Sequence, residues 1–160
     1  MMWESLTACT SREQDWKALD WRTTAPQEVQ NDFDTLLRDA VDAVAKALTT
    51  TDSFSPLMLV IDQSGRKGLR MSQPRHSSAD EQTIIDGLQL AGDRIALRAR
   101  TSVFDVTVTA PFSGTAIKAV LEHRTGWAVD VLVPYLVNPN EVRIDLDAAS
   151  GAVATRRLWR

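Results

Sequence analysis

The residue with the clearest capacity for chemistry in the sequence is His123. It ends a predicted strand, and the register of that strand places the imidazole on an apolar face beside Trp127. A histidine there could transfer protons or bind a ligand, because its ordinary pKa lies near neutrality. Asp130 faces the opposite side in this register and Asp105 alternates away from its apolar neighbours, so neither carboxylate is expected to orient the ring. The competing interpretation is a hairpin-end histidine that is hydrogen-bonded to backbone or water.

A pocket around His123 would need further polar side chains, and an earlier strand supplies two. Arg98 and Arg100 lie on a long predicted strand and could add positive charge to a cavity lined by His123 and Trp127. Such a cavity would make the protein a binder of small ligands or a small enzyme, with His123 as its catalytic candidate.

A basic stretch is the second candidate site. No acidic residue lies between Gln63 and Ala79, and this interval holds Arg66, Lys67, Arg70, Arg75 and His76. Arg66 and Lys67 fall at a predicted hairpin tip, close in sequence to a helix start at Ser78, so they could bind a phosphate, a carboxylate or an acidic partner surface. A solvated basic loop in an acidic protein is the alternative. A shorter run of arginines surrounds two residues that are expected to dock the C-terminus, Leu158 and Trp159.

Tryptophans are concentrated near the start of the chain. Three of the five, Trp3, Trp16 and Trp21, fall within residues 1–24 amid polar residues. They could cover a groove of the same chain or anchor another chain, because tryptophan is enriched at the strongest points of protein interfaces.

Several common chemistries lack their signatures. Two histidines and one cysteine leave no short-spaced zinc motif and no intramolecular disulfide, and no cofactor is expected. The glycine-rich loops of nucleotide-binding proteins and the G-x-S-x-G turn of hydrolases are missing. With 18 basic and 21 acidic side chains the net charge is −3, which gives no general attraction to nucleic acid or to an anionic membrane.

Membrane insertion and secretion are also disfavoured by the sequence. The longest aliphatic run, Leu57 to Ile61, is much shorter than the ~18 residues of a membrane span. Charged side chains interrupt the first turns, where a secretory signal would be apolar. We therefore expect a cytoplasmic protein without a nucleic acid or membrane partner.

One domain is expected to position these residues. A chain of 160 residues with 44% apolar residues can bury a core without a crosslink, so residues 1–160 should form a single domain, with residues 1–24 packed on its body. A short helix could form over residues 11–21. A capping box of Thr24 and Gln27 begins a long amphipathic helix that ends near Leu48.

A second helix and several strands follow. Ser78 with Glu81 forms another capping box, and Gly92 would end that helix. The strands are predicted as a hairpin of 57–62 with 68–72, a long strand 95–109, strands 115–123 and 127–134, and a hairpin of 141–146 with 151–158.

Two details of strand geometry follow from the alternation of apolar residues. In the long strand the apolar positions change parity at Val103 and Phe104, which predicts a β-bulge there. A three-residue loop over 124–126, with its glycine in a left-handed conformation, pairs Leu121 with Val129 and leaves one face apolar throughout.

The order of these elements predicts an α+β domain. Its antiparallel, curved sheet would have about five to six strands, with two to three helices packed on one face. This order resembles the cone-shaped family named for nuclear transport factor 2, and the resemblance implies a pocket enclosed by helices and a bent sheet. The segment 122–135, which contains EHRTGWA and LVPY, is similar to a segment of small uncharacterised bacterial proteins, and this resemblance implies no substrate.

Two functions remain open at this point. The first is a non-catalytic binding protein that recognises a protein partner, as small chaperones and immunity-type proteins do, or a second copy of itself. The lack of a catalytic constellation motivates it. The second is a pocket protein or small enzyme of the cone-shaped type, with His123 and Trp127 lining the cavity.

Overall fold

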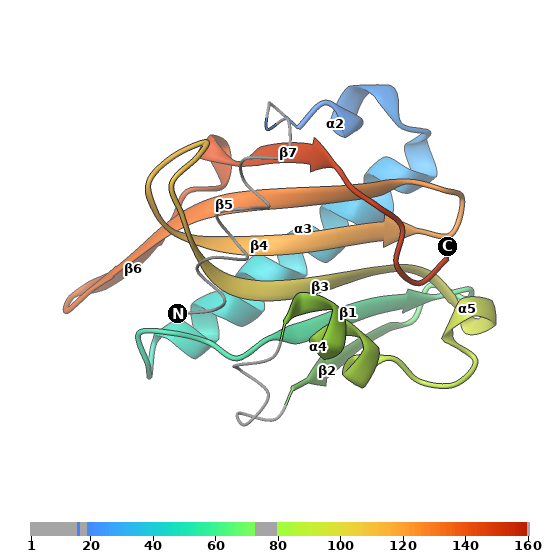
Figure 1. Ribbon diagram of the computed structural model, residues 1–160, viewed down its shortest axis with the longest axis horizontal. Helices are drawn as coiled ribbons and strands as arrows, with labels where there is room; N and C mark the ends of the chain where they lie inside the picture. Colours follow the sequence, from blue (N-terminus) through green and yellow to red (C-terminus); the bar gives the residue numbers. More distant parts are fainter. Residues whose placement is uncertain (1–15, 17–18, 73–79, 160) are drawn as a thin grey trace.

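Seven strands form one antiparallel sheet in the computed structural model, which describes residues 16, 19–72 and 80–159 (Figure 1). The strands follow the order β2-β1-β3-β4-β5, and both β6 and β7 pair with the far edge of β5. Their bounds are β1 (Leu57–Asp62), β2 (Lys67–Met71), β3 (Leu97–Val108), β4 (Gly114–His123), β5 (Ala128–Asn138), β6 (Glu141–Ile144) and β7 (Ser150–Val153). The expected α+β class with a curved antiparallel sheet is confirmed.

Helix α3 (Gln27–Leu48) covers one face of the sheet, which we call the α3 face. The predicted apolar stripe is buried from Val29 to Leu48 and packs on the odd-numbered apolar residues of β1, β4 and β5. The predicted capping box is wrong. The Thr24 hydroxyl donates to the Asp20 carbonyl at 3.0 Å, because Thr24 lies in the short helix α2 (Trp21–Thr24). Helix α3 begins directly after Pro26.

The opposite face, which we call the second face, is covered by helix α4 (Glu81–Leu88) and by the C-terminal residues Leu158 and Trp159. The apolar side chains of α4 pack with even-numbered sheet residues such as Met58 and Val60. The helices therefore lie on both sides of the sheet and not on one face as expected, because the even-numbered sheet residues are apolar as well and need a cover of their own. None of the described helices is long and apolar enough to span a bilayer.

The boundaries of α4 differ from the prediction. Its N-cap is Asp80, whose carboxylate accepts the Thr83 backbone N–H at 2.8 Å, and Ser78 lies outside the described residues. The helix ends at Leu88 rather than at Gly92. Gly92 adopts a φ of +89° and turns the chain into the short helix α5 (Asp93–Ala96), which occupies the beginning of the predicted long strand.

The predicted bulge at Val103 and Phe104 is wrong, because β3 keeps a regular register with β4 from Ala99 to Val108. The apolar parity changes at this point because both faces of β3 are covered. Val103 belongs to the core on the α3 face, whereas Phe104 and Val106 belong to the core on the second face.

A bulge lies instead at the start of β3. Ile61 pairs with Ala99 but its neighbour Asp62 pairs with Leu97, so Arg98 is the extra residue. Leu97 packs into the core of the second face and Ala99 into that of the α3 face. The bulge therefore decides which way Arg98 points.

The hairpin of β4 and β5 has the predicted register. Leu121 pairs with Val129, and the His123 N–H donates to the Trp127 carbonyl at 2.8 Å. The N–H of Gly126 donates to the His123 carbonyl at 3.0 Å and closes the three-residue loop. Gly126 has a φ of +116°, as the predicted loop requires.

The predicted hairpin of 141–146 with 151–158 is wrong. Strand β6 pairs with residues 135–138 of β5, and β7 pairs with residues 129–132 of the same strand. Between them the 3-10 helix η2 (Leu146–Ala148) carries the chain along the edge of β5. Because β5 is 11 residues long, its edge accommodates both short strands in succession.

Replacing Gly126 with alanine is expected to lower the free energy of unfolding by about 1–2 kcal/mol, because L side chains rarely adopt a positive φ. The new Cβ would also lie 3.4 Å from Nη1 of Arg156. The matched control is Gly87→Ala in α4, where a Cβ meets nothing within 4 Å and alanine favours the helix by about 0.5–1 kcal/mol. Urea unfolding measures both variants, and equal stabilities would contradict the left-handed loop.

Candidate functional site

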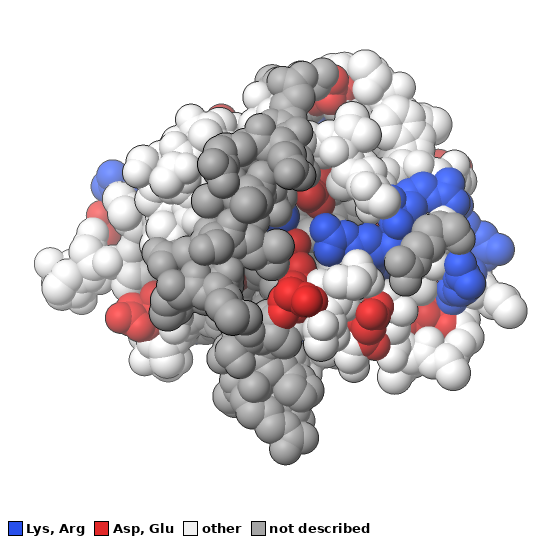
Figure 2. All heavy atoms as spheres, in the orientation of Figure 1, with Lys and Arg blue, Asp and Glu red and all other residues white. Residues whose placement is uncertain are grey.

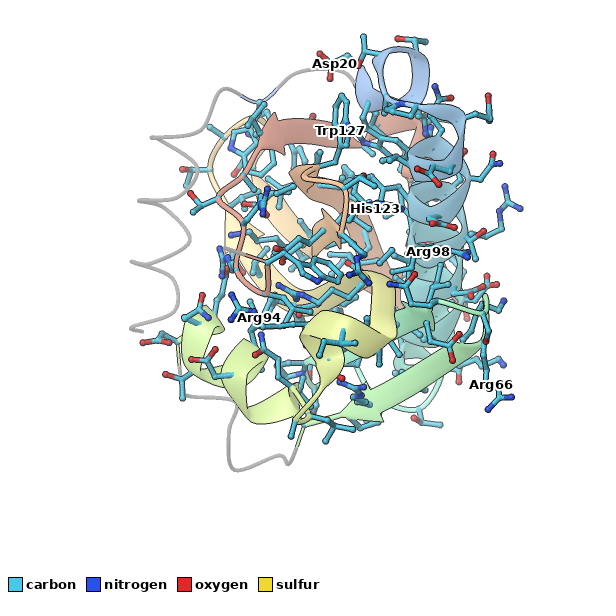
Figure 3. The ribbon with its side chains drawn as sticks, turned by 90° about the vertical axis from the view of Figure 1, so that its right-hand side faces the viewer. Asp20, Arg66, Arg94, Arg98, His123 and Trp127 are labelled. Atoms are coloured by element: carbon cyan, nitrogen blue, oxygen red, sulfur yellow. The ribbon has the colours of Figure 1, made fainter. Side chains whose placement is uncertain are left out.

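His123 lies at the end of β4, and both of its ring nitrogens are hydrogen-bonded (Figure 3). Nε2 lies 3.0 Å from Oδ2 of Asp32 in α3, and Nδ1 lies 2.8 Å from the Thr125 hydroxyl oxygen. The Thr125 backbone N–H donates to Nδ1 at 3.2 Å, so Nδ1 acts as an acceptor and the Nε2–H group is the one that donates a hydrogen bond to Asp32. The Asp32 carboxylate also accepts from Nε and Nη2 of Arg98, at 2.9 and 3.0 Å.

The carboxylate partner of His123 is a side chain that the sequence analysis did not identify. Asp32 is 91 residues away along the chain. One signal could have found it: Asp32 falls on the buried stripe of α3, three residues after Val29 and next to Phe33. An acid on the apolar face of a helix needs a buried partner. The His123 side chain is only 1% exposed, so its ring is closed to a substrate and ties α3 to the β4–β5 hairpin.

The other residues of the expected pocket lie apart. The bulge sends Arg98 to Asp32 on the α3 face, whereas Arg100 lies on the second face and pairs with Glu122 at 2.7 Å. Trp127 is half-buried against the core of the α3 face and lines a hollow of about 330 Å³ between α2 and β7. His123 does not line that hollow.

The predicted basic stretch is divided among separate contacts. Arg70 binds the Asp93 carboxylate through both Nη atoms, at 2.7 and 3.1 Å, and Lys67 pairs with Asp39 of α3 at 3.0 Å. Arg66 is exposed at the turn between β1 and β2. The remaining two members of the stretch, Arg75 and His76, lie outside the described residues.

The described tryptophans of the N-terminal segment pack within the chain. Trp21 is buried and meets Phe33 edge-on at a centroid distance of 5.4 Å. Trp16 packs against the core of the second face. Trp3 lies outside the described residues.

The second face holds a buried charge cluster around Glu122. Its carboxylate pairs with Arg100 and also accepts the backbone N–H groups of Arg157, Leu158 and Trp159, at distances between 2.9 and 3.1 Å. Burial lowers the pKa of Arg100 and the Glu122 charge opposes that shift. These bonds dock the C-terminal residues, as predicted. Among the described residues, no three His, Cys, Asp or Glu side chains are grouped as a metal site.

Arginines from separate turns gather at one end of the sheet, which we call the basic end. Figure 3 labels three of its members, Arg66 of the β1–β2 turn, Arg94 of α5 and Arg98 of the bulge. The other two are Arg124 of the β4–β5 turn, which contacts the Ile95 carbonyl of α5, and Arg156, which lies beside Gly126 of the same turn. Figure 2 shows basic side chains gathered near the C-terminus on the face that it presents. Arg66, Arg124 and Arg156 are exposed and form no ion pair with a described residue. Arg124 donates to the Ile95 carbonyl and Arg156 to the Trp159 carbonyl, so these two guanidinium groups are oriented by backbone carbonyls and keep their net charge.

Helix α5 lies at the centre of the basic end and exposes an aliphatic side chain. The Ile95 carbonyl accepts from Nη1 of Arg124 at 3.2 Å and from Nε2 of Gln63 at 3.4 Å, so turns from two hairpins flank it. The Ile95 side chain remains 78% exposed. The nearby carboxylate of Asp62 accepts hydrogen bonds from its own turn, and the one from the Ser64 hydroxyl lowers its pKa most.

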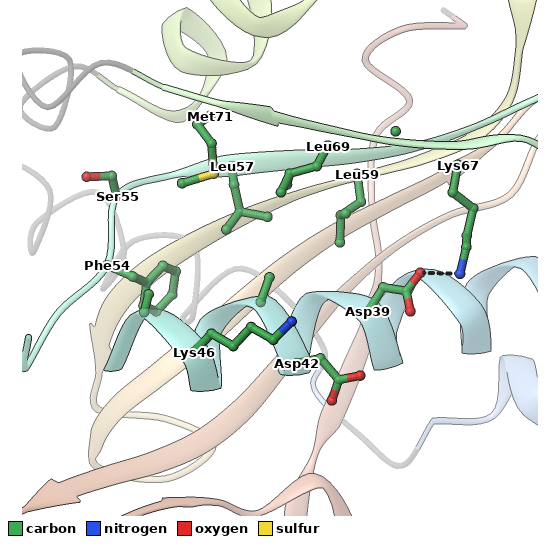
Figure 4. Close-up of a pocket in the computed structure, with 13 residues that line it drawn as sticks. Asp39, Asp42, Lys46, Phe54, Ser55, Leu57, Leu59, Lys67, Leu69 and Met71 are labelled. Atoms are coloured by element: carbon green, nitrogen blue, oxygen red, sulfur yellow. Dashed lines mark ion pairs between the residues drawn. The ribbon is translucent and has the colours of Figure 1, made fainter. Parts of the chain in front are cut away.

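A separate groove lies between α3 and the β1–β2 hairpin (Figure 4). It has a volume of about 530 Å³ and a largely apolar wall that includes Leu57 and Leu59 of β1. Leu69 and Met71 of the outer strand β2 complete this wall and remain exposed. The pair of Lys67 and Asp39 bridges the groove towards one end.

Replacing Asp32 with alanine is expected to lower the free energy of unfolding by about 2–4 kcal/mol, because it leaves His123 and Arg98 without their shared acceptor. Asp34→Ala on the exposed side of α3 is the control. Its contact to Arg22 joins two largely exposed side chains and should matter by less than about 0.5 kcal/mol. Denaturant unfolding distinguishes the two, and equal losses would refute a special role for Asp32.

Comparison of the chain with family models, with curated proteins and with solved structures finds no match. No relative therefore assigns a role to the basic end, to the groove or to the contact between Asp32 and His123. Their roles are inferred from geometry and charge.

Proposed function

We propose that the protein is a non-catalytic binding protein that holds an acidic segment of a protein partner at its basic end. The observation that carries the proposal is that turns bearing arginines meet at the end of the sheet where Ile95 is 78% exposed, in a chain whose net charge is −3. Arg124 itself donates to the Ile95 carbonyl. Guanidinium groups bind carboxylates in a paired geometry, and an exposed aliphatic side chain offers apolar contact between them.

An acidic protein segment fits this end better than a nucleic acid does. Single-stranded nucleic acids stack their bases on exposed aromatic rings. Among the described residues of the basic end the exposed apolar side chain is Ile95, whereas the aromatic Trp159 is buried and its indole N–H donates to the Arg94 carbonyl at 3.0 Å. A segment that alternates carboxylates with apolar residues would match both features.

The state of His123 supports a binding role over a catalytic one. Its two ring nitrogens are occupied by Asp32 and Thr125, and its side chain is buried. A small-ligand pocket near Trp127 is the weaker alternative, since His123 is absent from the lining of that hollow. The single cysteine of the chain is consistent with a reducing compartment such as the cytoplasm.

A charge reversal tests this function. A fluorescent peptide of about ten residues that alternates Glu and Leu should bind the protein, and binding should weaken as salt is raised because exposed charges are screened. Arg66→Glu combined with Arg124→Glu should weaken binding by about ten-fold or more. Arg38→Glu, an exposed arginine in the middle of α3, should leave it unchanged.

Fluorescence anisotropy measures all three proteins. No binding of the peptide, or equal binding by the reversed variant, would overturn the proposal. Tighter binding of an oligothymidylate of equal charge would also overturn it and would favour a nucleic acid partner.

A further inference from the structure

We propose that strand β2 pairs with β2 of a second copy of the chain, antiparallel and about a two-fold axis at Leu69. The two sheets would then become one continuous sheet, with the two basic ends at opposite ends of the pair. The inference concerns a different surface from the basic end and does not depend on the function proposed for it.

The first ground is the free hydrogen-bonding edge of β2. The Asp62 N–H donates to the Arg66 carbonyl at 2.9 Å, and the Ser72 N–H donates to the Pro56 carbonyl at 3.0 Å. Since backbone groups alternate in direction along a strand, the even-numbered residues of β2 face β1 and the odd-numbered residues face outward. Among the described residues nothing pairs with this outward edge, which belongs to Lys67, Leu69 and Met71.

The second ground is the apolar character of that edge. Leu69 is 53% exposed and Met71 is 57% exposed, and both point to the side of the groove that Leu57 and Leu59 line. Natural proteins usually protect an edge strand with charges, prolines or a covering element, because an exposed apolar edge pairs with other strands. Here two large apolar side chains occur at alternate positions on the edge itself.

The third ground is that the strand complements itself. A two-fold axis at Leu69 places Leu69 opposite its own copy, Lys67 opposite Met71 and Gly68 opposite Arg70. No charged residue then faces a like charge, and every outward backbone group finds a partner. An axis at Arg70 would instead place two arginines opposite each other. The strand Lys67–Met71 is therefore matched to a second copy, whereas no feature of the described structure specifies a strand of another protein.

Neighbouring contacts leave this edge accessible. Arg70 points to the other side of the sheet, where Asp93 holds it at 2.7 Å. Lys67 is held by Asp39 of α3, so its charge is balanced within its own subunit. Pairing at Leu69 would thus bury apolar side chains and leave both charged side chains with their ion-pair partners.

A charge-swap experiment tests the pairing by sedimentation velocity. The wild-type chain should be a dimer at about 100 μM, whereas Leu69→Lys and Leu69→Glu should each be monomers, because like charges would meet at the axis. An equimolar mixture of the two variants should restore the dimer. Leu136 is similarly exposed, on β5, and Leu136→Lys is the control that should remain a dimer.

A disulfide measures the register directly. The Cα atoms of a hydrogen-bonded antiparallel pair lie about 5.5 Å apart, within the range of a disulfide. In a Cys9→Ser background, Leu69→Cys should form a covalent dimer on mild oxidation and Leu136→Cys should not.

Three results would overturn the proposal. These are a wild-type monomer at that concentration, a dimer that survives Leu69→Lys, and equal crosslinking of the two cysteine variants. Circular dichroism shows whether each variant is folded, and the mixture of Lys and Glu variants can form a dimer only if both are. Peptide binding at the basic end should be unchanged in all the Leu69 variants, so failure here leaves the proposed function standing.

Discussion

The fold depends on the burial of one carboxylate, that of Glu122. It lies under the second face, where it pairs with Arg100 and accepts the backbone N–H groups of residues 157–159. A buried charge is tolerated only when its partners are all present, because the interior solvates it poorly. The second face can therefore close only with the C-terminal residues in place, and Leu158 and Trp159 belong to the core rather than to a tail.

Coverage of the sheet on both faces explains which features could be predicted from the sequence. The two strands of the β4–β5 hairpin are adjacent in the sequence, so the alternation of apolar residues around Leu121 and Val129 is enough to predict their register. On β3 the change of parity at Phe104 indicates a bulge only if the sheet has one covered face. In this sheet the same change marks a shift of packing from α3 to α4. The sequence predicts that β6 and β7 pair with each other, whereas both pair with β5. The free edge of β5 exists only once the sheet has assembled, so no local sequence pattern reveals it.

The candidate sites also depend on contacts between segments that are distant in the sequence, which the sequence alone does not predict. The sequence singled out His123 and Arg66, but the partner of the first comes from a helix 91 residues away. The other members of the basic end come from α5, from the β3 bulge, from the β4–β5 turn and from the C-terminal segment. Residues such as Arg124 and Arg156 carry no local signal, because only the sheet topology places their turns at one end.

The bonds from Glu122 to residues 157–159 also bear on how the chain is made. Helix α3 and strands β1 to β5 leave the ribosome before the C-terminal segment, so the α3 face can assemble while synthesis continues. The Glu122 carboxylate, paired with Arg100, lacks its three backbone N–H donors until residues 157–159 have been translated. A nascent chain that has not yet reached residues 157–159 therefore carries one finished face and one unfinished face.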